Sequence, residues 1–271
     1  MFWNLKEFID EIFFLIHNLL NSLHLIYIKL INRKLIKRSN SRFIKHNNNI
    51  DDVIIVANGP SSSHCKVRKG AKLIFVNFGY QHSAFIEAIN PVLVVVDKKL
   101  SNGSWSIKML TDAYDLNPTV QFAFGGHLLK SQDVRDFANS YRSCFIFTDL
   151  NFTRFSKTRK YRLGDIAVGG GATESAIMLA VSLGAKKLNV FGFDGNNVVL
   201  GLAGLDTHFY GSDPMKDWRN PKFVARELRF LSYFIDKNRY LSDYLAALEI
   251  ELINNTDTEY MKRHQKTDEE R

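Results

Sequence analysis

The sequence predicts an α/β protein built on a doubly wound, mostly parallel, Rossmann-like sheet. Six short runs of residues are apolar at almost every position, which is typical of strands that are buried on both faces. The stretches between these runs are long enough for helical crossovers, and such crossovers join parallel strands. With 271 residues and 45% hydrophobic content, the chain can also bury a large core.

The first 46 residues are predicted to form an amphipathic helical segment that lies in a membrane interface. Apolar residues dominate positions 13–31, and the first 50 residues carry eight Lys or Arg against three Asp or Glu, which is +5 of the chain's +8. The apolar face would enter the lipid while basic residues meet anionic head groups. These basic residues are Arg33, Lys34, Lys37, Arg38, Arg42 and Lys45. No nucleic-acid partner is expected.

The same segment admits other structures. A signal peptide is disfavoured because acidic residues precede the apolar stretch and no small-residue cleavage site follows it. A transmembrane span fits residues 12–32 on length, but five polar side chains interrupt it. The open alternative is a helical hairpin packed on the protein's own core or on a dimer partner.

An α/β domain is predicted over residues 47–255, after a polar hinge at 39–50 and before a loose, charged tail at 256–271. The expected strands, in chain order, are Val53–Ala57, Lys72–Asn77, Val92–Val96, Val120–Phe124, Cys144–Thr148 and Leu188–Phe191. The two cysteines form no CxxC pair and lack the spacing of a zinc site, so no metal site is expected. This cysteine usage is typical of a reducing cytoplasm.

The clearest helix of this domain is Thr173–Leu183. It has a Thr-x-x-Ser start, small residues for close packing on a sheet, and Gly184 as its stop. A second helical stretch is expected over residues 223–248, broken near Asn238.

Polar residues follow the first three predicted strands. In an open parallel sheet, ligands bind beyond the carboxyl ends of the strands, so these residues predict a nucleotide site. Glycine permits close backbone approach, proline makes the turn rigid, and the amide and hydroxyl groups can hold phosphate or ribose oxygens. Turns of this composition also occur without any ligand. The residues are Asn58, Gly59, Pro60, Ser61, Asn77 and Asp97.

A second glycine-rich element, residues 164–174, leads into the long helix. Three consecutive glycines before a helix N-terminus favour an anion cradle, although a flexible connection is the alternative. The element matches neither a P-loop nor a GxGxxG fingerprint. Past the sixth strand, Asp194 could contact a sugar hydroxyl or a base amine, or cap the following turn. The predicted nucleotide contacts of both elements are Gly170, Gly171, Ala172, Thr173, Gly192, Asp194 and Asn196.

These motifs, in this order, resemble glycosyltransferase family 42, the bacterial sialyltransferases of the Campylobacter lipooligosaccharide type. The resemblance covers about residues 52–255 and rests on VIIVANGPS, VNFGYQ, GGGATESAIMLAVSLGAKKLNVFGFDGN and THFYGSD. The motifs are also similar to the MAF flagellin glycosyltransferases and the MptE-like pterin pyrophosphokinases. The resemblance implies a GT-A-like variant of the Rossmann-like sheet.

Residue by residue, the family's cytidine-binding corner matches Asn58, Gly59 and Ser61, with Ala57 in place of a glycine. The family's asparagine after the second strand matches Asn77. Its asparagine after the third strand is an aspartate here, as in the pyrophosphokinase-like group.

The family's catalytic histidine lies in a His-Tyr-x-Gly stretch that matches His208–Gly211. Without the resemblance, a single histidine in a polar loop is more often structural or solvated. The family's arginine ahead of the helix and its two phosphate-holding tyrosines have no aligned counterpart. Only Arg162 and Tyr210 are near enough to substitute, so a donor other than CMP-sialic acid would serve the same geometry.

The resemblance implies an inverting glycosyltransferase with His208 as general base and no cofactor. It would move sialic acid or a similar sugar from a nucleotide donor, such as a CMP-sugar, to a lipooligosaccharide or capsular glycan at the inner face of the membrane. A homo-oligomer is compatible with this expectation. One alternative is a pyrophosphokinase in which Asp97 and Asp194 bind Mg²⁺. Another is a non-catalytic nucleotide-binding protein anchored to the membrane.

Overall fold

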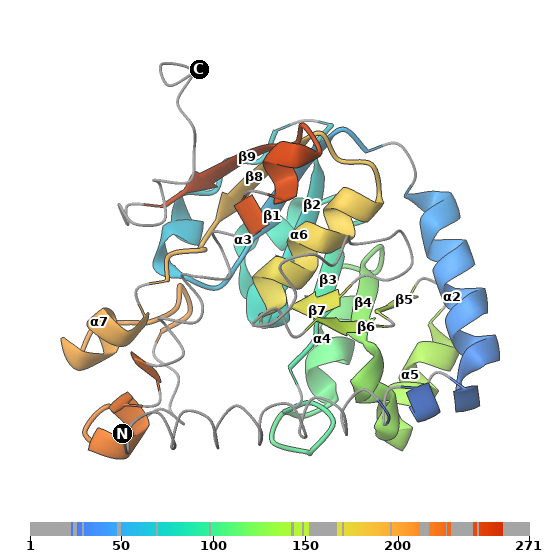
Figure 1. Cartoon of the computed structure of the whole chain (residues 1–271), viewed down its shortest axis with the longest axis horizontal. Coiled ribbons are helices and arrows are strands. Elements are labelled where there is room, and N and C mark those ends of the chain that lie inside the picture. Colours follow the sequence, from blue (N-terminus) through green and yellow to red (C-terminus); the bar gives the residue numbers. More distant parts are fainter. Residues whose placement is uncertain are drawn as a thin grey trace, which may run out of the picture.

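The computed structural model contains a central sheet with helices packed on both faces (Figure 1). Seven strands, all parallel to their neighbours, run in the order β5-β4-β3-β2-β1-β8-β9. The predicted doubly wound α/β sheet is confirmed. The structure describes residues 23, 26–28, 30–47, 50–68, 70–97, 99–141, 144–147, 149–151, 167–169, 171–195, 197–211, 217–225, 227–228, 241–242 and 244–256.

All six predicted strands are present, with ends within one residue of those expected. They are β1 Asp52–Val56, β2 Lys72–Val76, β3 Val92–Val95, β4 Gln121–Gly125, β5 Cys144–Phe147 and β8 Lys187–Phe191. The prediction of six strands was nevertheless incomplete, because β9 (Glu251–Asn255) pairs with β8 as the seventh. Its two asparagines are uncommon in strands and hide the pattern. A separate two-stranded sheet, β6 (Asp149–Asn151) and β7 (Ala167–Gly169), was also not predicted.

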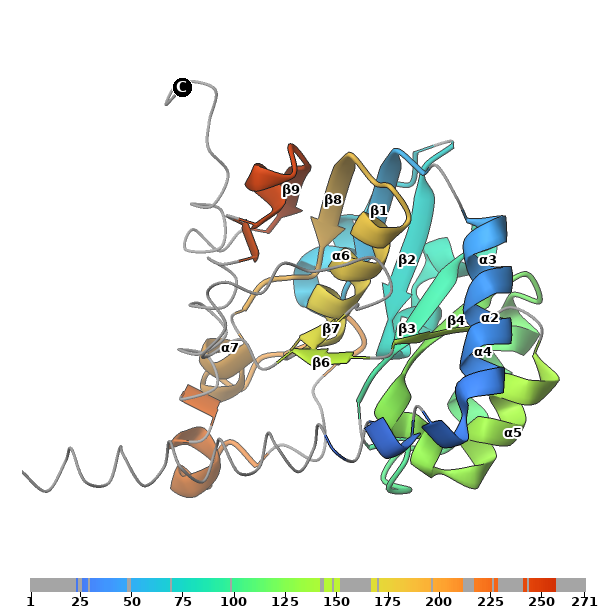
Figure 2. The ribbon, with the colours of Figure 1, turned by 45° about the vertical axis from the view of Figure 1, so that its right-hand side comes forward.

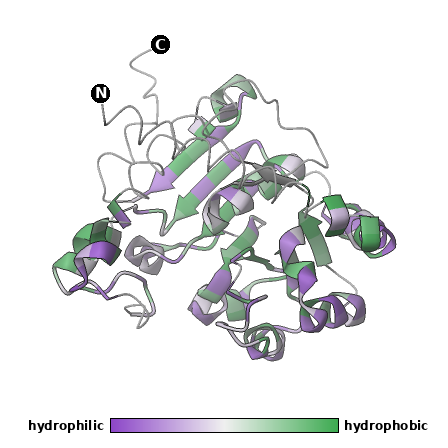
Figure 3. Ribbon diagram, turned by 60° about the horizontal axis from the view of Figure 1, so that its bottom comes forward, coloured by the Kyte–Doolittle hydropathy of each residue, from purple (hydrophilic) through white to green (hydrophobic). Residues whose placement is uncertain are grey.

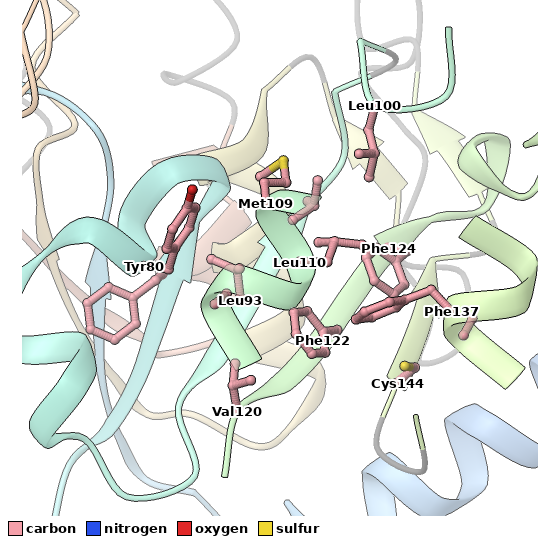
Figure 4. Close-up of a cluster of buried hydrophobic side chains, with 14 of the residues drawn as sticks. Tyr80, Leu93, Leu100, Met109, Leu110, Val120, Phe122, Phe124, Phe137 and Cys144 are labelled. Atoms are coloured by element: carbon pink, nitrogen blue, oxygen red, sulfur yellow. The ribbon is translucent and has the colours of Figure 1, made fainter. Parts of the chain in front are cut away.

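Helices cover both faces of the sheet, and alternate strand residues point to each. On one face, α3 (Ser83–Glu87), α4 (Lys108–Leu116) and α5 (Gln132–Ser140) pack against residues such as Phe122 and Phe124. Figure 4 shows this cluster, where Leu110 of α4 and Phe137 of α5 meet those two rings. The other face packs on α6 (Ala172–Ser182), which confirms the clearest predicted helix to within one residue.

The remaining elements are short or lie outside the sheet. Three short 3-10 helices each begin at or near the end of a strand, namely η1 Pro60–His64, η2 Asn77–Gln81 and η3 Gly126–Lys130. The short helix α7 (Asn197–Leu202) follows β8. The described parts of the predicted 223–248 stretch are largely helical, whereas Asn238 lies outside the described residues. Figure 3 shows that helices around the sheet carry both hydrophobic and hydrophilic segments, as amphipathic helices do.

The helix α2 (Arg33–His46) packs along the β5 edge of the sheet. Phe43 is fully buried against Phe145 of β5, with ring centroids 5.4 Å apart. The side-chain amide of Asn40 accepts from Ile146 N (2.7 Å) and donates to Ile146 O (2.9 Å), which satisfies backbone groups of this edge strand. The predicted polar hinge at 39–50 is therefore helical as far as His46, because its few apolar side chains are anchored in the core.

No helix in the described part of the chain combines the length and hydropathy needed to cross a bilayer. The basic side chains of α2 are exposed on the face away from the sheet, namely Arg33, Lys34, Lys37, Arg38, Arg42 and Lys45. Membrane association of residues 1–46 stays a prediction.

A partly buried lysine lies at the amino edge of the sheet. Lys72 Nζ donates to Asn90 O (2.6 Å) and to Gln121 Oε1 (3.0 Å), and burial lowers the pKa of Lys72 to about 8. Because this folded-state pKa lies below the unfolded value of 10.5, the unfolded chain holds more protons between about pH 8 and 10. The free energy of unfolding should therefore rise with pH in this window.

We expect this pH dependence to disappear in Lys72→Met. Between pH 7 and 9.5, the free energy of unfolding of wild type should rise by about 1–2 kcal/mol more than that of Lys72→Met, once the partial exposure of Lys72 is allowed for. Urea unfolding of both proteins at the two pH values measures the difference. An equal change in wild type and variant would show that Lys72 does not titrate in this range.

The order of the strands creates a topological switch point at β1. From β1 the chain builds β2 to β5 on one side, and then returns through α6 to place β8 and β9 on the other side. Ligand sites in open parallel sheets form at such points, beyond the carboxyl ends of the strands. The loops that follow β1 and β8 are therefore the first place to look for a site.

Candidate functional site

The corner that follows β1, residues 57–61, is joined to the last residue of β8 and to the loop after it by backbone hydrogen bonds. Ala57 N donates to Phe191 O (2.8 Å) and Gly59 N donates to Gly192 O (2.9 Å). A Cβ on residue 59 would overlap the Asp194 carboxylate and Gly192 O. The absence of a side chain at Gly59 therefore permits the loop after β8 to pack closely on the corner. Contact of Gly59 with a nucleotide stays a prediction.

Ser61 is buried and its polar groups are used inside the protein. Its Oγ accepts from Gly192 N (2.9 Å) and donates to Asp194 Oδ1, while Ser61 N donates to Asp194 Oδ2 (3.0 Å). Pro60 opens η1 directly before it. Direct contact of Ser61, Gly192 and Asp194 with a nucleotide stays a prediction.

Among the described residues, three buried side-chain oxygens near the corner and the loop after α7 lack hydrogen-bond partners, and Asn254 Oδ1 at the end of β9 is a fourth at this edge of the sheet. The first three belong to Asn58 after β1, Asn77 after β2, and Thr207 in the loop after α7. Asn77 also has a φ of 49°, a left-handed conformation that asparagine tolerates better than most residues. Buried polar atoms without partners are unfavourable unless something satisfies them. The two amide oxygens are acceptors, so water or a ligand group that donates, such as a hydroxyl or an amine, would satisfy them.

The predicted base lies in a tight hairpin that rests on the corner. His208 and Gly211 exchange backbone hydrogen bonds (3.2 and 3.0 Å), and Phe209 N donates to Asn58 O (3.0 Å). The ring of Tyr210 stacks on the ring of His208, with centroids 5.0 Å apart and an interplanar angle of 21°. The two segments singled out by the sequence, 58–61 and 208–211, are thus in direct contact.

A chain of aromatic rings extends from this hairpin. Tyr210 meets Phe78 at 5.7 Å, and Phe78 meets Trp105 at 4.8 Å, while Lys99 Nζ lies 5.5 Å from the Trp105 ring centroid. All three rings are partly exposed. Of these three rings, only Tyr210 was singled out from the sequence. Phe78, Trp105 and Thr207 were missed, although Phe78 and Thr207 lie in the motifs VNFGYQ and THFYGSD.

His82 is a further residue that sequence reasoning missed. Its Nδ1 accepts from Ala84 N (3.1 Å), so its Nε2 carries the proton that is donated to Ser62 O (3.0 Å). Its ring also packs on Phe209, with centroids 5.4 Å apart. His82 therefore connects the segment after β2 to both η1 and the hairpin.

The glycine-rich approach to α6 contains a buried carboxylate. Glu174 is 3% exposed, and its carboxylate occupies the space where a Cβ on Gly171 would lie. Ala172 and Thr173, in the first turn of α6, are partly buried. An anion bound at this N-terminus would meet the charge of Glu174. The predicted residues Gly170, Asn196 and Arg162 lie outside the described residues.

The two aspartates of the pyrophosphokinase alternative follow β3 and β8. These strands are three places apart in the sheet, which is about 14 Å at the usual strand spacing. Asp97 Oδ1 accepts from Lys99 N (2.9 Å) in a local turn, and Asp194 binds Ser61. Among the described residues, no group of three or more His, Cys, Asp or Glu gathers as metal ligands would.

Neither a protein-family model nor a curated protein matches this sequence. Among solved structures, the chain is similar to the sialyltransferase CstII from Campylobacter jejuni in complex with the substrate analogue CMP-3FNeuAc (15% identity, 76% of this chain, 87% of that chain, TM-score 0.35). It is also similar to the sialyltransferase CST-II in complex with a trisaccharide acceptor and CMP (14% identity, 75% of this chain, 80% of that chain, TM-score 0.39). A third similar structure is an α-2,3-sialyltransferase from Campylobacter jejuni in its apo form (11% identity, 81% of this chain, 82% of that chain, TM-score 0.39).

At identities of 11–15% and TM-scores of 0.35–0.39, these likenesses assign neither family membership nor function. What is established is the fold class: a doubly wound α/β protein, in which polar groups of the 57–61 corner and the 208–211 hairpin lie at the switch point of the sheet. The similarity to flagellin glycosyltransferases and pyrophosphokinases stays a prediction.

Proposed function

We propose that the protein is a glycosyltransferase that moves sialic acid or a similar sugar from a nucleotide donor, such as a CMP-sugar, to a lipooligosaccharide or capsular glycan. The observation that carries this proposal is the hydrogen bond from Phe209 N to Asn58 O (3.0 Å). It joins the hairpin of the candidate base to the candidate nucleotide corner at the switch point. The resemblance of both segments to family 42 motifs supports the same function.

In the proposed reaction, the imidazole of His208 takes the proton of an acceptor hydroxyl as that oxygen bonds to the anomeric carbon of the donor sugar. The bond between this carbon and the phosphate oxygen breaks, and its electron pair leaves with the nucleotide. Attack opposite the phosphate inverts the anomeric centre. The amides of Asn58 and Asn77 would donate hydrogen bonds to the departing phosphate. Tyr210 would hold the imidazole in place by stacking.

The N-terminus of α6 would face a different part of the donor. Because Glu174 brings a carboxylate to this helix end, the ribose hydroxyls or the base amine fit there better than the phosphate does. Gly171, Ala172 and Thr173 would then border the nucleoside.

A nucleotide panel tests the donor class. CMP at about 100 times its dissociation constant should raise the melting temperature by roughly 5–10 °C, with or without Mg²⁺. UDP, GDP and ATP should give smaller shifts, and cytidine without a phosphate is the matched control. Stabilisation only by ATP with Mg²⁺ would instead support the pyrophosphokinase chemistry.

We further propose that the acceptor is reached at the cytoplasmic surface of a membrane. The residues ahead of α2 expose more than half of five large apolar side chains, which are Leu23, Ile26, Tyr27, Leu30 and Ile31. Val199 and Leu202 of α7 and the adjacent Leu205 are also more than half exposed. In Figures 1 and 2, α7 lies at the left, and the residues ahead of α2, in dark blue, lie to the right of it and lower. Apolar contact and the basic face of α2 together fit an anionic bilayer.

Binding to vesicles measures this association. Ile26→Ser/Leu30→Ser/Ile31→Ser should lower co-sedimentation with phosphatidylcholine–phosphatidylglycerol vesicles by at least about tenfold, because each buried apolar side chain contributes about 1.5–3 kcal/mol. Ile89→Ser is the matched control, since Ile89 is 84% exposed in another part of the chain. An equal loss of vesicle binding in both variants, or no loss in either, would contradict the assignment of the residues ahead of α2 as the membrane-binding surface.

A further inference from the structure

Asp194 lies beneath the corner with 3% of its surface exposed, and both of its oxygens bind protein groups. Oδ2 accepts from Ser61 N (3.0 Å). Oδ1 accepts from the hydroxyl of Ser61 and from Thr256 Oγ1 (2.7 Å). Ser61 Oγ already accepts from Gly192 N, so its proton is left to donate to Asp194. All of these contacts need an acceptor, which suits a carboxylate.

These contacts link three strands that are far apart in the sequence. Ser61 follows β1, Asp194 follows β8, and Thr256 follows β9. Thr256 is 3% exposed, although it was predicted to begin a loose tail. The buried hydroxyl of Thr256 therefore connects the last strand of the sheet to the corner that carries Asn58.

We propose that Asp194 is a positioning residue that holds the Asn58–Ser61 corner in its nucleotide-binding conformation, with Thr256 as its support. This inference rests on the proposed function, because it names what fixes the donor site. It assigns Asp194 a role that needs no direct contact with the nucleotide. A buried carboxylate that accepts several hydrogen bonds orders the groups that donate to it, and each such bond to a charged group is strong.

Matched variants at Thr256 test the inference with the full-length protein. Thr256→Val removes the hydroxyl but keeps the shape, whereas Thr256→Ser keeps the hydroxyl. Asp194→Asn replaces one acceptor oxygen with a donor, which would face Ser61 N–H or the two hydroxyls. Two readouts are needed: hydrogen–deuterium exchange of peptides covering residues 57–65, and the dissociation constant of CMP by calorimetry.

We expect faster exchange of residues 57–65 and a roughly three- to tenfold weaker CMP affinity in Thr256→Val, with Thr256→Ser within about twofold of wild type. In Asp194→Asn, the affinity for CMP should fall by at least about tenfold. If Asp194→Asn does not fold, the comparison of Thr256→Val with Thr256→Ser alone decides whether the corner is positioned in this way. Unchanged exchange in Thr256→Val, or equal effects of valine and serine, would overturn the positioning role.

The two proposals fail in different ways. Faster exchange with unchanged CMP affinity would overturn the positioning of a donor site. If the wild type binds no CMP, the proposed donor class fails, and the exchange data alone decide whether Asp194 and Thr256 hold the corner.

Discussion

Replacing His208 with alanine should lower the rate of sugar transfer by about 10²- to 10⁴-fold, because the acceptor hydroxyl loses its general base. CMP affinity should stay within about twofold of wild type. The backbone of His208, not its ring, makes the hydrogen bonds of the hairpin with Gly211, and Phe209 N makes the bond to Asn58. The corner should therefore survive the substitution. Transfer from CMP-sialic acid to lactose measures the rate, and calorimetry with CMP measures the affinity.

His46→Ala provides the control for this experiment. His46 is an exposed histidine at the end of α2, and its ring contacts only Arg42 O among the hydrogen bonds of the described residues. This variant should transfer at the wild-type rate. Loss of both transfer and CMP affinity in His208→Ala would indicate a structural histidine instead of a base.

Gly59→Ala should destabilise the fold by about 2–3 kcal/mol and weaken CMP binding by more than about tenfold. The conformation of Gly59 suits any residue, since its φ is −69°, so the cost is steric. The added Cβ would overlap the Asp194 carboxylate and Gly192 O, and overpacking of this kind forces the backbone to move. Because the corner carries Asn58, the displacement should reach the nucleotide. Urea unfolding and calorimetry with CMP give the two numbers.

Gly70→Ala separates crowding from ordinary backbone strain. Gly70 has a φ of 90°, but no atom lies within 4 Å of the position that its Cβ would take. We expect a cost of about 1–2 kcal/mol from the left-handed conformation and no change in CMP affinity. If Gly59→Ala behaved in the same way as Gly70→Ala, the close packing of the β1 and β8 loops would be refuted.

Much of the fold was readable from local patterns. Strands buried on both faces must be apolar at consecutive positions, so β1 to β5 and β8 were found with ends within one residue. The edge strand β9 was not predicted, because Asn254 and Asn255 interrupt the run of apolar residues. The polar stretch around Asn40 suggested a hinge, yet it is helical, since Phe43 is anchored in the core and Asn40 pairs with the backbone of β5.

The candidate site was predictable in part. Parallel strands deliver their carboxyl ends to one edge, so Asn58 and Asn77 could be placed together from sequence order. The contact between the corner and the His208 hairpin was suggested only by the resemblance. Thr207 lies in the THFYGSD motif but was given no role. His82 and Trp105 carried no signal, because a single polar or aromatic residue in a loop is common in any protein.

By itself, the sequence determined the class of the sheet, the position of its strands and the edge at which polar residues gather, because these depend on the pattern of neighbouring residues. Only the tertiary structure decided which polar groups face outward and which are used internally. Ser61 and Asp194 are 133 residues apart, yet each is the other's hydrogen-bond partner. Such a partnership depends on how β1 and β8 pair in space, and no local pattern encodes it.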